Sequence, residues 1–490
     1  MRFILFSLAI SLAPGVASAQ SRCDQVMRQL AGQLADAVCF ESADLTTTNP
    51  ATTPQNNSLP GLPPFAFTPQ TDRSVIAPSA GKRPPITKVV PGVQIQARFS
   101  GDATGQGRFL LRLPNDWNGG LVVAGASGTR SEFNGDFAWS DYVVQQGYAY
   151  ASQNKGVLNL YLSTAADPLA CRLNPDLPVY VHFYDNDPGQ QFSRWRDFMV
   201  LAADVARRGV KAHYRHAPRF TYAVGTSNGG YQVRRAVETA PELFDGGVDW
   251  EGTFVDPHAP NLLTDLPPAI LNFPDYVASG YASASTAAKN IRAAGYPPDL
   301  LAGAASMWRS HSDSFWEVTQ CQWQKRLDPT YDTYVDGTGT YNYVARLSSS
   351  DVGAQMASFA TTGKIKRPLI TVAGTMDALL PIDHHARAYA RLVKERDSGE
   401  TDRDRNHGHG RSDFAAYRLY EVQNGNHLET LQDTFSELEL IQPHAQRAFD
   451  LLVRHVEQRT QLPPDQCIGR GGLIVDAPSA VGHCASLLAP

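Results

Sequence analysis

Apolar runs alternate with helical patterns along much of the chain. Apolar and polar residues alternate over 93–100 and 107–113, which predicts two antiparallel strands at the edge of a sheet. Longer apolar runs predict buried strands, and spaced apolar positions predict helices between them. The predicted strands are 121–124, 147–152, 220–224, 244–251, 368–374 and 417–422, and the predicted helices are 137–146, 191–213, 230–240, 382–394 and 442–458. This alternation is typical of a mostly parallel α/β sheet.

The alternation stops between residues 253 and 366, where proline, alanine and aromatic residues accumulate. We interpret this stretch as a cap or lid inserted into the sheet domain. The remaining parts are then a signal peptide (1–19), an N-terminal helix and extended linker (20–90), the α/β core (91–252 and 367–459) and a C-terminal tail that contains a disulfide (460–490). The N-terminal helix is expected at 24–38, where apolar residues recur at helical intervals.

The first residues have the pattern of an export signal. Arg2 precedes an apolar run over 3–12, and Ala17-Ser18-Ala19 matches a cleavage site, so we expect residues 1–19 to be removed. The run is too short to span a bilayer and no later run is long enough, so no membrane insertion is expected. The sequence therefore predicts a secreted or periplasmic protein.

Six cysteines fit an oxidising compartment. The sequence allows many connectivities. Proximity favours Cys23–Cys39 and Cys467–Cys484, which leaves Cys171–Cys321 as a long-range pair.

Composition narrows the possible partners. The chain has 490 residues, a hydrophobic content of 42% and a net charge of -5. These values are ordinary for a globular protein with a substantial core, and the charge does not favour nucleic acid as a partner.

The segment 219–230 contains the strongest chemical motif. An apolar strand leads into Gly225-Thr-Ser-Asn-Gly229, which matches G-x-S-x-G, and a helical pattern follows. Strand, tight turn and helix are the context of a nucleophile elbow, which exposes the central serine hydroxyl. Ser227 is therefore the candidate nucleophile. The alternative is a glycine-rich turn in which Ser227 only caps the helix.

A serine nucleophile needs a base and an acid that orients the base. Asp377 follows the buried strand 368–374, and His427 follows the strand 417–422. The ends of parallel strands are where an open α/β sheet places its site, so these two residues are the candidates. Asp383 could replace Asp377 as the acid, and His384 or His385 could replace His427 as the base.

The oxyanion of an acyl-transfer intermediate needs fixed donors. The backbone N–H of Asn228 is one candidate, because it follows the nucleophile directly. The second donor is expected from the glycine-rich loop after residue 124, at Ala126 or Ser127. We expect no metal and no organic cofactor, although His407-Gly-His409 could bind a metal ion.

With these residues in place, the chain resembles the tannase and feruloyl esterase family of α/β-hydrolases, and also the hydroxybutyrate-oligomer hydrolases. The pieces that carry the resemblance are 113–119, 147–156, the elbow with Ser-Asn-Gly-Gly, 374–381 and Gly425-Asn-His427. The resemblance implies an α/β-hydrolase fold, the triad order Ser-Asp-His and ester hydrolysis. Tannase-like enzymes join a cysteine before the serine to a cysteine before the histidine, whereas Thr226 and Asn426 stand at those places here. Gallate or ferulate specificity therefore does not carry over.

We thus expect an exported serine carboxylic-ester hydrolase that works through an acyl-enzyme. Its substrate would be an aromatic or hydroxyalkanoate ester, or a short oligoester. Trp308, Trp316 and Trp323 in the expected cap favour an apolar or aromatic-tolerant pocket, or a surface that grips a short oligomer. The alternatives are an amidase or peptidase with the same triad, and an inactive exported binding protein.

Overall fold

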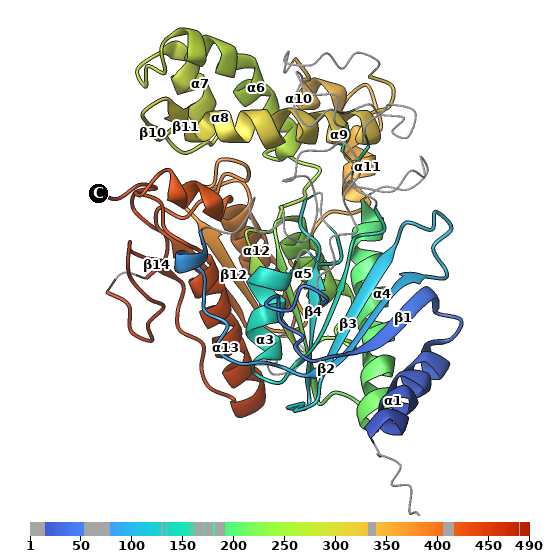
Figure 1. Cartoon of the computed structure of the whole chain (residues 1–490). Coiled ribbons are helices and arrows are strands. Elements are labelled where there is room, and N and C mark those ends of the chain that lie inside the picture. The colour runs from blue at the N-terminus through green and yellow to red at the C-terminus, as the bar shows by residue number, and fades with distance from the viewer. Residues whose placement is uncertain are drawn as a thin grey trace, which may run out of the picture.

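The computed structural model shows one sheet of ten strands with helices on both faces, and a second group of helices above the sheet (Figure 1). The structure describes residues 15–52, 79–128, 131–133, 135–157, 160–161, 171, 180–181, 192–331, 340–404, 416–479 and 481–490. In spatial order the sheet strands are β1 (Leu34–Ser42), β2 (Gly92–Phe99), β3 (Arg108–Pro114), β5 (Ala149–Gln153), β4 (Gly120–Gly125), β8 (Phe220–Thr226), β9 (Gly246–Trp250), β12 (Leu369–Gly374), β13 (Tyr417–Val422) and β14 (Gln466–Ile468).

The direction of the strands decides where the functional loops lie. The pairs from β1 to β5 are antiparallel, and the pairs from β5 to β14 are parallel. The ends of β4, β8, β12 and β13 are in register through the pairs Gly125↔Gly225 and Gly374↔Val422. The loops that follow these strands therefore leave from one edge of the sheet.

Each face of the sheet has its own apolar core. One face packs against α1 (Gly15–Leu30), α4 (Ser193–Tyr214), α5 (Asn228–Thr239) and α12 (Ala386–Asp404). The other face packs against the π-helical turn η2 (Asp136–Ser140), α3 (Asp141–Val144) and α13 (Gln442–Gln458). The central strands β4 and β12 are buried throughout, which explains their continuous apolar sequences.

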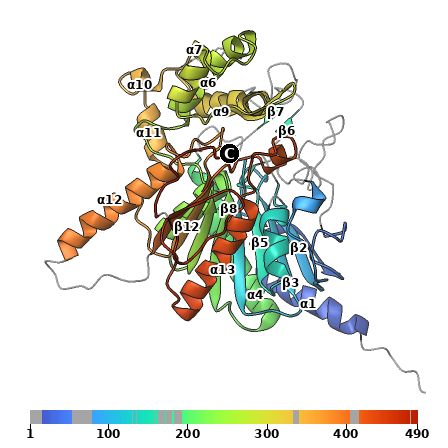
Figure 2. The same ribbon diagram turned by 90° about the vertical axis from the view of Figure 1, so that its left-hand side faces the viewer.

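The helices above the sheet form a cap (Figures 1 and 2), and the apolar core of the cap also includes residues of α4, α5 and the loop after β12. They come from the expected insertion and comprise α6 (Leu262–Ala278), α7 (Thr286–Ala293), α8 (Met307–His311), the π-helical turn η3 (Ser312–Trp316), α9 (Glu317–Leu327), α10 (Tyr343–Arg346) and α11 (Val352–Ala357). The short elements outside these layers are the pairs β6 (Leu160–Tyr161) with β7 (Tyr180–Val181) and β10 (Leu301–Ala302) with β11 (Ala305–Ser306), and the 3-10 turns η1 (Ala80–Lys82) and η4 (Glu429–Asp433).

The N-terminal helix differs from its prediction. The helix expected at 24–38 ends at Leu30, and the chain continues as β1, which pairs with β2. Apolar residues recur beyond the end of the helix because β1 also packs on the core. Leu34 and Cys39 contact the same core as Val26. The strands at 93–100 and 107–113 do pair antiparallel, but β1 lies outside them at the sheet edge.

The three expected disulfides are confirmed. They join Cys23 to Cys39, Cys171 to Cys321 and Cys467 to Cys484. The last one ties β14 to the tail that follows it, and β14 itself was not predicted. Among the helices that the structure describes, none is long and apolar enough to cross a membrane.

Candidate active site

Ser227 occupies a strained turn between β8 and α5. Its backbone has φ 59° and ψ −123°, which is an unfavourable region for a residue with a side chain. Its N–H donates to Trp250 O at 2.9 Å, and its carbonyl accepts from Tyr231 N at 3.1 Å. These bonds to β9 and to the first turn of α5 hold the conformation that the G-x-S-x-G motif predicts.

Glycines beside the serine allow the strands and helix to approach closely. A Cβ atom on Gly225 would lie 2.4 Å from the carbonyl carbon of Gly229. A Cβ atom on Gly229 would lie 2.6 Å from the carbonyl oxygen of Gly125, at the end of β4. The two glycines of the motif therefore bring α5 against β8 and against the loop expected to hold the oxyanion.

Asp377 and His427 meet at the sheet edge, as the sequence predicted from the ends of their strands. His427 Nδ1 lies 2.8 Å from Asp377 Oδ2, and both residues are buried. The other carboxylate oxygen, Oδ1, accepts from Leu379 N at 2.8 Å and from Leu380 N at 2.7 Å. Burial acts to raise the pKa of Asp377, but the charge and hydrogen bond of His427 and the two N–H donors outweigh it and lower this pKa.

Backbone contacts bring the loops after β12 and β13 together. A Cβ atom on Gly374 would lie 2.3 Å from Gly425 O, so glycine is required at this contact. Met376 N donates to Gly425 O at 2.7 Å, and the Asn426 amide donates to Met376 O at 2.5 Å. Asn426, which stands where tannases have a cysteine, thus links the acid loop to the histidine loop by a hydrogen bond.

A second carboxyl group, that of Glu251, lies beside this pair. Its Oε2 is 3.6 Å from His427 Nδ1, and its Oε1 accepts from Gly374 N at 2.9 Å. Burial and the nearby charge of Asp377 raise the pKa of Glu251 well above its usual range. Sequence reasoning placed Glu251 at the end of a strand and assigned it no role.

Within the described part of the chain, Glu251, Asp377 and His427 are also the one group with the composition of a metal site. Their candidate ligand atoms lie within 4.8 Å of one another. The Nδ1 atom that would bind a metal is already at hydrogen-bond distance from Asp377. The arrangement is therefore that of an imidazole oriented by a carboxylate.

Two side chains form hydrogen bonds with the backbone of the loop after β4. Gln232 Oε1 accepts the N–H of Ala126 at 2.8 Å. The buried Lys155 ammonium donates to Ser127 O at 2.6 Å, to Ala126 O at 3.3 Å and to Gly128 O. The Ala126 N–H is thus already bonded to a side chain of α5, which argues against Ala126 as an oxyanion donor and leaves Ser127 as the candidate from this loop.

Asn228, the other expected donor, begins α5. Its side-chain Oδ1 accepts from the Thr253 hydroxyl at 2.9 Å, which fixes the first turn of the helix. Lys155 and Gln232 were both missed from the sequence, although Lys155 lies within the 147–156 stretch that carries the family resemblance.

The cap rests on the acid and histidine loops. Trp316 Nε1 donates to Ala378 O at 2.7 Å, next to Asp377. Met307 Sδ lies 3.3 Å from the Asn426 amide. Trp308, Trp316 and Trp323 are all buried in the core of the cap, so the interpretation of these three residues as a substrate-facing surface is wrong.

The alternative acid and bases lie elsewhere. His384 Nδ1 is 3.0 Å from Asp265 Oδ1 of α6, and His385 Nδ1 accepts from Phe254 N at 3.0 Å. Asp383 pairs with Arg387 one turn later, at 3.0 Å. These contacts attach the start of α12 to α6 and to the segment after β9. His407 and His409 lie outside the described residues.

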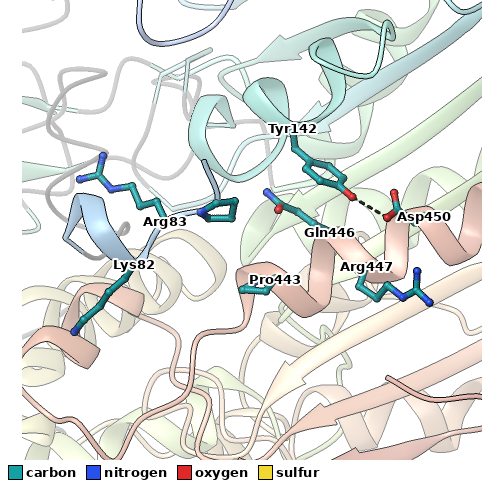
Figure 3. A pocket seen from close by; sticks show the side chains of 8 residues that line it. Lys82, Arg83, Tyr142, Pro443, Gln446, Arg447 and Asp450 are labelled. Atoms are coloured by element: carbon teal, nitrogen blue, oxygen red, sulfur yellow. Dashed lines mark hydrogen bonds between the residues drawn. The ribbon is translucent and has the colours of Figure 1, made fainter. Parts of the chain in front are cut away.

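A hollow on the side of the body, between α13 and the segment at 82–84, is separate from this site (Figure 3). In it, the Tyr142 hydroxyl donates to Asp450 Oδ2 at 2.8 Å. Lys82, at its rim, is paired with Asp433 at 2.8 Å. None of the predicted site residues lines this hollow.

Comparison with known proteins gives both a family match and structural neighbours. Residues 285–481 match the family model of the 3HB-oligomer hydrolases (3HBOH). No curated protein matches the chain. Feruloyl esterase B from Aspergillus oryzae superposes with a TM-score of 0.53 at 12% identity, over 90% of this chain and 91% of that one. An esterase from Aspergillus oryzae gives 0.48 at 14% identity, over 90% of both chains, and tannin acyl hydrolase from Aspergillus niger gives 0.43 at 13% identity, over 80% and 87%.

These findings define the fold of the protein. The chain has the α/β-hydrolase fold, and part of it matches a family of ester-oligomer hydrolases. The predicted resemblance to the hydroxybutyrate-oligomer hydrolases is confirmed over 285–481, a range that includes Asp377 and His427 and excludes Ser227.

Proposed function

We propose that the protein is an exported serine esterase in which Ser227 is the nucleophile, His427 the base and Asp377 the acid that orients it. One observation carries this proposal. The 2.8 Å contact between His427 and Asp377 lies at the carboxyl ends of the parallel strands. The strained turn that holds Ser227 follows β8 at the same ends. The three residues also follow the chain order Ser, Asp, His that is usual for this fold.

The reaction follows from these positions. His427 takes the proton from Ser227 Oγ as the hydroxyl attacks the ester carbonyl, and Asp377 stabilises the resulting imidazolium. The backbone N–H groups of Asn228 and Ser127 are the proposed donors to the oxyanion. His427 then gives its proton to the leaving alcohol, and water releases the acid from the acyl-enzyme by the same steps.

The substrate we favour is a short oligoester of a hydroxyalkanoic acid. The 3HB-oligomer hydrolase match over 285–481 supports this choice, since that range contains most of the cap and two triad candidates. Thr226 and Asn426 replace the cysteine pair of tannases, which gives no support for gallate esters. Aromatic esters remain the alternative substrate class.

Export is part of the same proposal. The three disulfides are stable only where the surroundings are oxidising. The pattern of residues 1–19 agrees with a cleaved signal, most of which lies outside the described residues. Mass spectrometry of the exported protein should find Gln20 as the first residue.

The test combines covalent labelling with hydrolysis assays. A fluorophosphonate should label the protein, and Ser227→Ala should abolish both labelling and ester hydrolysis. Ser283→Ala, an exposed serine of the cap, is the matched control and should keep both. Persistent labelling of Ser227→Ala would refute the site.

A substrate series then separates the functions that share these residues. Hydroxybutyrate oligomers should be hydrolysed faster than gallate, ferulate and the corresponding amides. Faster hydrolysis of amides would favour the amidase alternative. Binding of these esters with neither labelling nor turnover would favour an inactive binding protein.

A further inference from the structure

Glu251 is a buried acid that the proposed triad does not use. It follows β9 directly, and β9 lies next to β12, the strand that leads to Asp377. Its side chain is 1% exposed and its Oε2 has no hydrogen-bond partner among the described residues. An unpartnered buried carboxyl oxygen is costly, so its position 3.6 Å from His427 Nδ1 calls for an explanation.

The backbone holds Glu251 in place at some cost. Its φ is 51°, an unfavourable value for a glutamate. Asp249 Oδ1 accepts from Gly252 N at 2.7 Å, while Asp249 Oδ2 accepts from Arg234 Nε at 2.6 Å. These bonds fix the turn at 249–252, and the turn presents the Glu251 carboxyl to the histidine.

We propose that Glu251 is a second carboxyl group for His427: a positioning residue that lies beside Asp377 and orients the imidazole when the charge of Asp377 is removed. The proposal rests on the triad proposed above. Asp377 takes the Nδ1 hydrogen bond because it is closer, at 2.8 Å against 3.6 Å, and because two N–H groups stabilise its charge. Glu251 receives one backbone donor, from Gly374, and the Trp250 side chain favours its charged form to a smaller extent.

Burial and the charges around Glu251 together explain why it holds the proton of the pair. Asp377 and Glu429 both act against its ionisation, and His427 is the cationic group that faces it when protonated. Two carboxyl groups at one imidazole cannot both ionise at low cost. Loss of the Asp377 charge removes the nearest opposing charge, so Glu251 can then ionise and accept the bond from Nδ1–H.

Three variants test this exchange: Asp377→Ala, Glu251→Gln and the double variant. Glutamine keeps an oxygen for the Gly374 N–H and stays neutral, so Glu251→Gln should lower kcat/KM far less than Asp377→Ala does. Asp377→Ala should lose activity, and adding Glu251→Gln should lower kcat/KM about tenfold further, the size expected for coupled neighbours. The acidic limb of the pH profile should lie at higher pH in Asp377→Ala than in the double variant.

The outcomes separate the inference from a structural role and from the proposed function. Equal kcat/KM and equal pH profiles in Asp377→Ala and the double variant, with both folded by circular dichroism, would overturn it. A loss in Glu251→Gln as large as that in Asp377→Ala would also overturn it, because a neutral residue would then not suffice. Full activity in Ser227→Ala would instead refute the triad itself.

Discussion

Gly229→Ala is the most direct test of how the fold positions Ser227, the proposed nucleophile. The added Cβ atom would lie 2.6 Å from the Gly125 carbonyl oxygen, whereas ordinary contact begins at 3.4 Å. The difference, 3.4 − 2.6 = 0.8 Å, is the least distance by which α5 and the end of β4 must separate. Because Ser227 precedes this turn of α5 and the oxyanion loop follows β4, the separation acts directly on the site.

The size of the effect should differ between activity and stability. Misplacement of reacting groups by about 1 Å can cost on the order of 100-fold in rate, so kcat/KM should fall about 10- to 100-fold. Overpacking costs about 1–3 kcal/mol, but alanine gains up to about 1 kcal/mol over glycine in a helix. The net loss of stability should therefore lie between about 0 and 3 kcal/mol, which leaves a folded protein.

The assay is hydrolysis of a short-chain p-nitrophenyl ester, with thermal unfolding followed by circular dichroism. Gly101→Ala is the matched control, because a Cβ atom there meets nothing within 4 Å, and it should leave both measurements unchanged. If Gly229→Ala kept the wild-type kcat/KM, the close approach of α5 to β4 would not be what positions Ser227. That result would refute the reasoning.

Three other predictions concern the oxyanion loop, the long-range disulfide and the contact between cap and core. Lys155→Met removes the donor to three carbonyls of the loop, so kcat should fall about 10- to 1000-fold with little change in KM; an unchanged kcat would exclude this role. Replacing Cys171 and Cys321 by alanine opens a loop with a separation of 150 residues and should cost about 5 kcal/mol in urea unfolding, more than loss of the disulfide that closes 16 residues. Asp265→Asn should lower Tm more at pH 5.5 than at pH 9. Burial acts to lower the pKa of His384, but Asp265 raises it overall, and stability from a raised histidine pKa is present at low pH and lost as pH rises through it.

Local chemistry made much of the fold predictable from sequence. The strands β4 and β12 are apolar runs of the expected length, because a strand covered on both faces needs apolar side chains on both. The helix predicted at 24–38 is too long because its apolar residues belong to two elements. The first ones lie on α1 and the later ones on β1, and both elements pack on the same core. The three buried tryptophans of the cap show a second limit of sequence reasoning. A tryptophan in a sequence can belong to an apolar core or to a binding surface, and the sequence does not distinguish the two.

The sequence by itself determined the motif around Ser227, the strand ends that carry Asp377 and His427, and the fold class. These are local patterns, and from them the rule that parallel strands end on the same side of a sheet predicts a candidate site. Only the tertiary structure decided which groups surround that site. Glu251, Lys155 and Gln232 act through contacts between segments far apart in the chain, at distances that no local pattern records. Burial then sets the charge of each group, because desolvation and neighbouring charges depend on packing from every side.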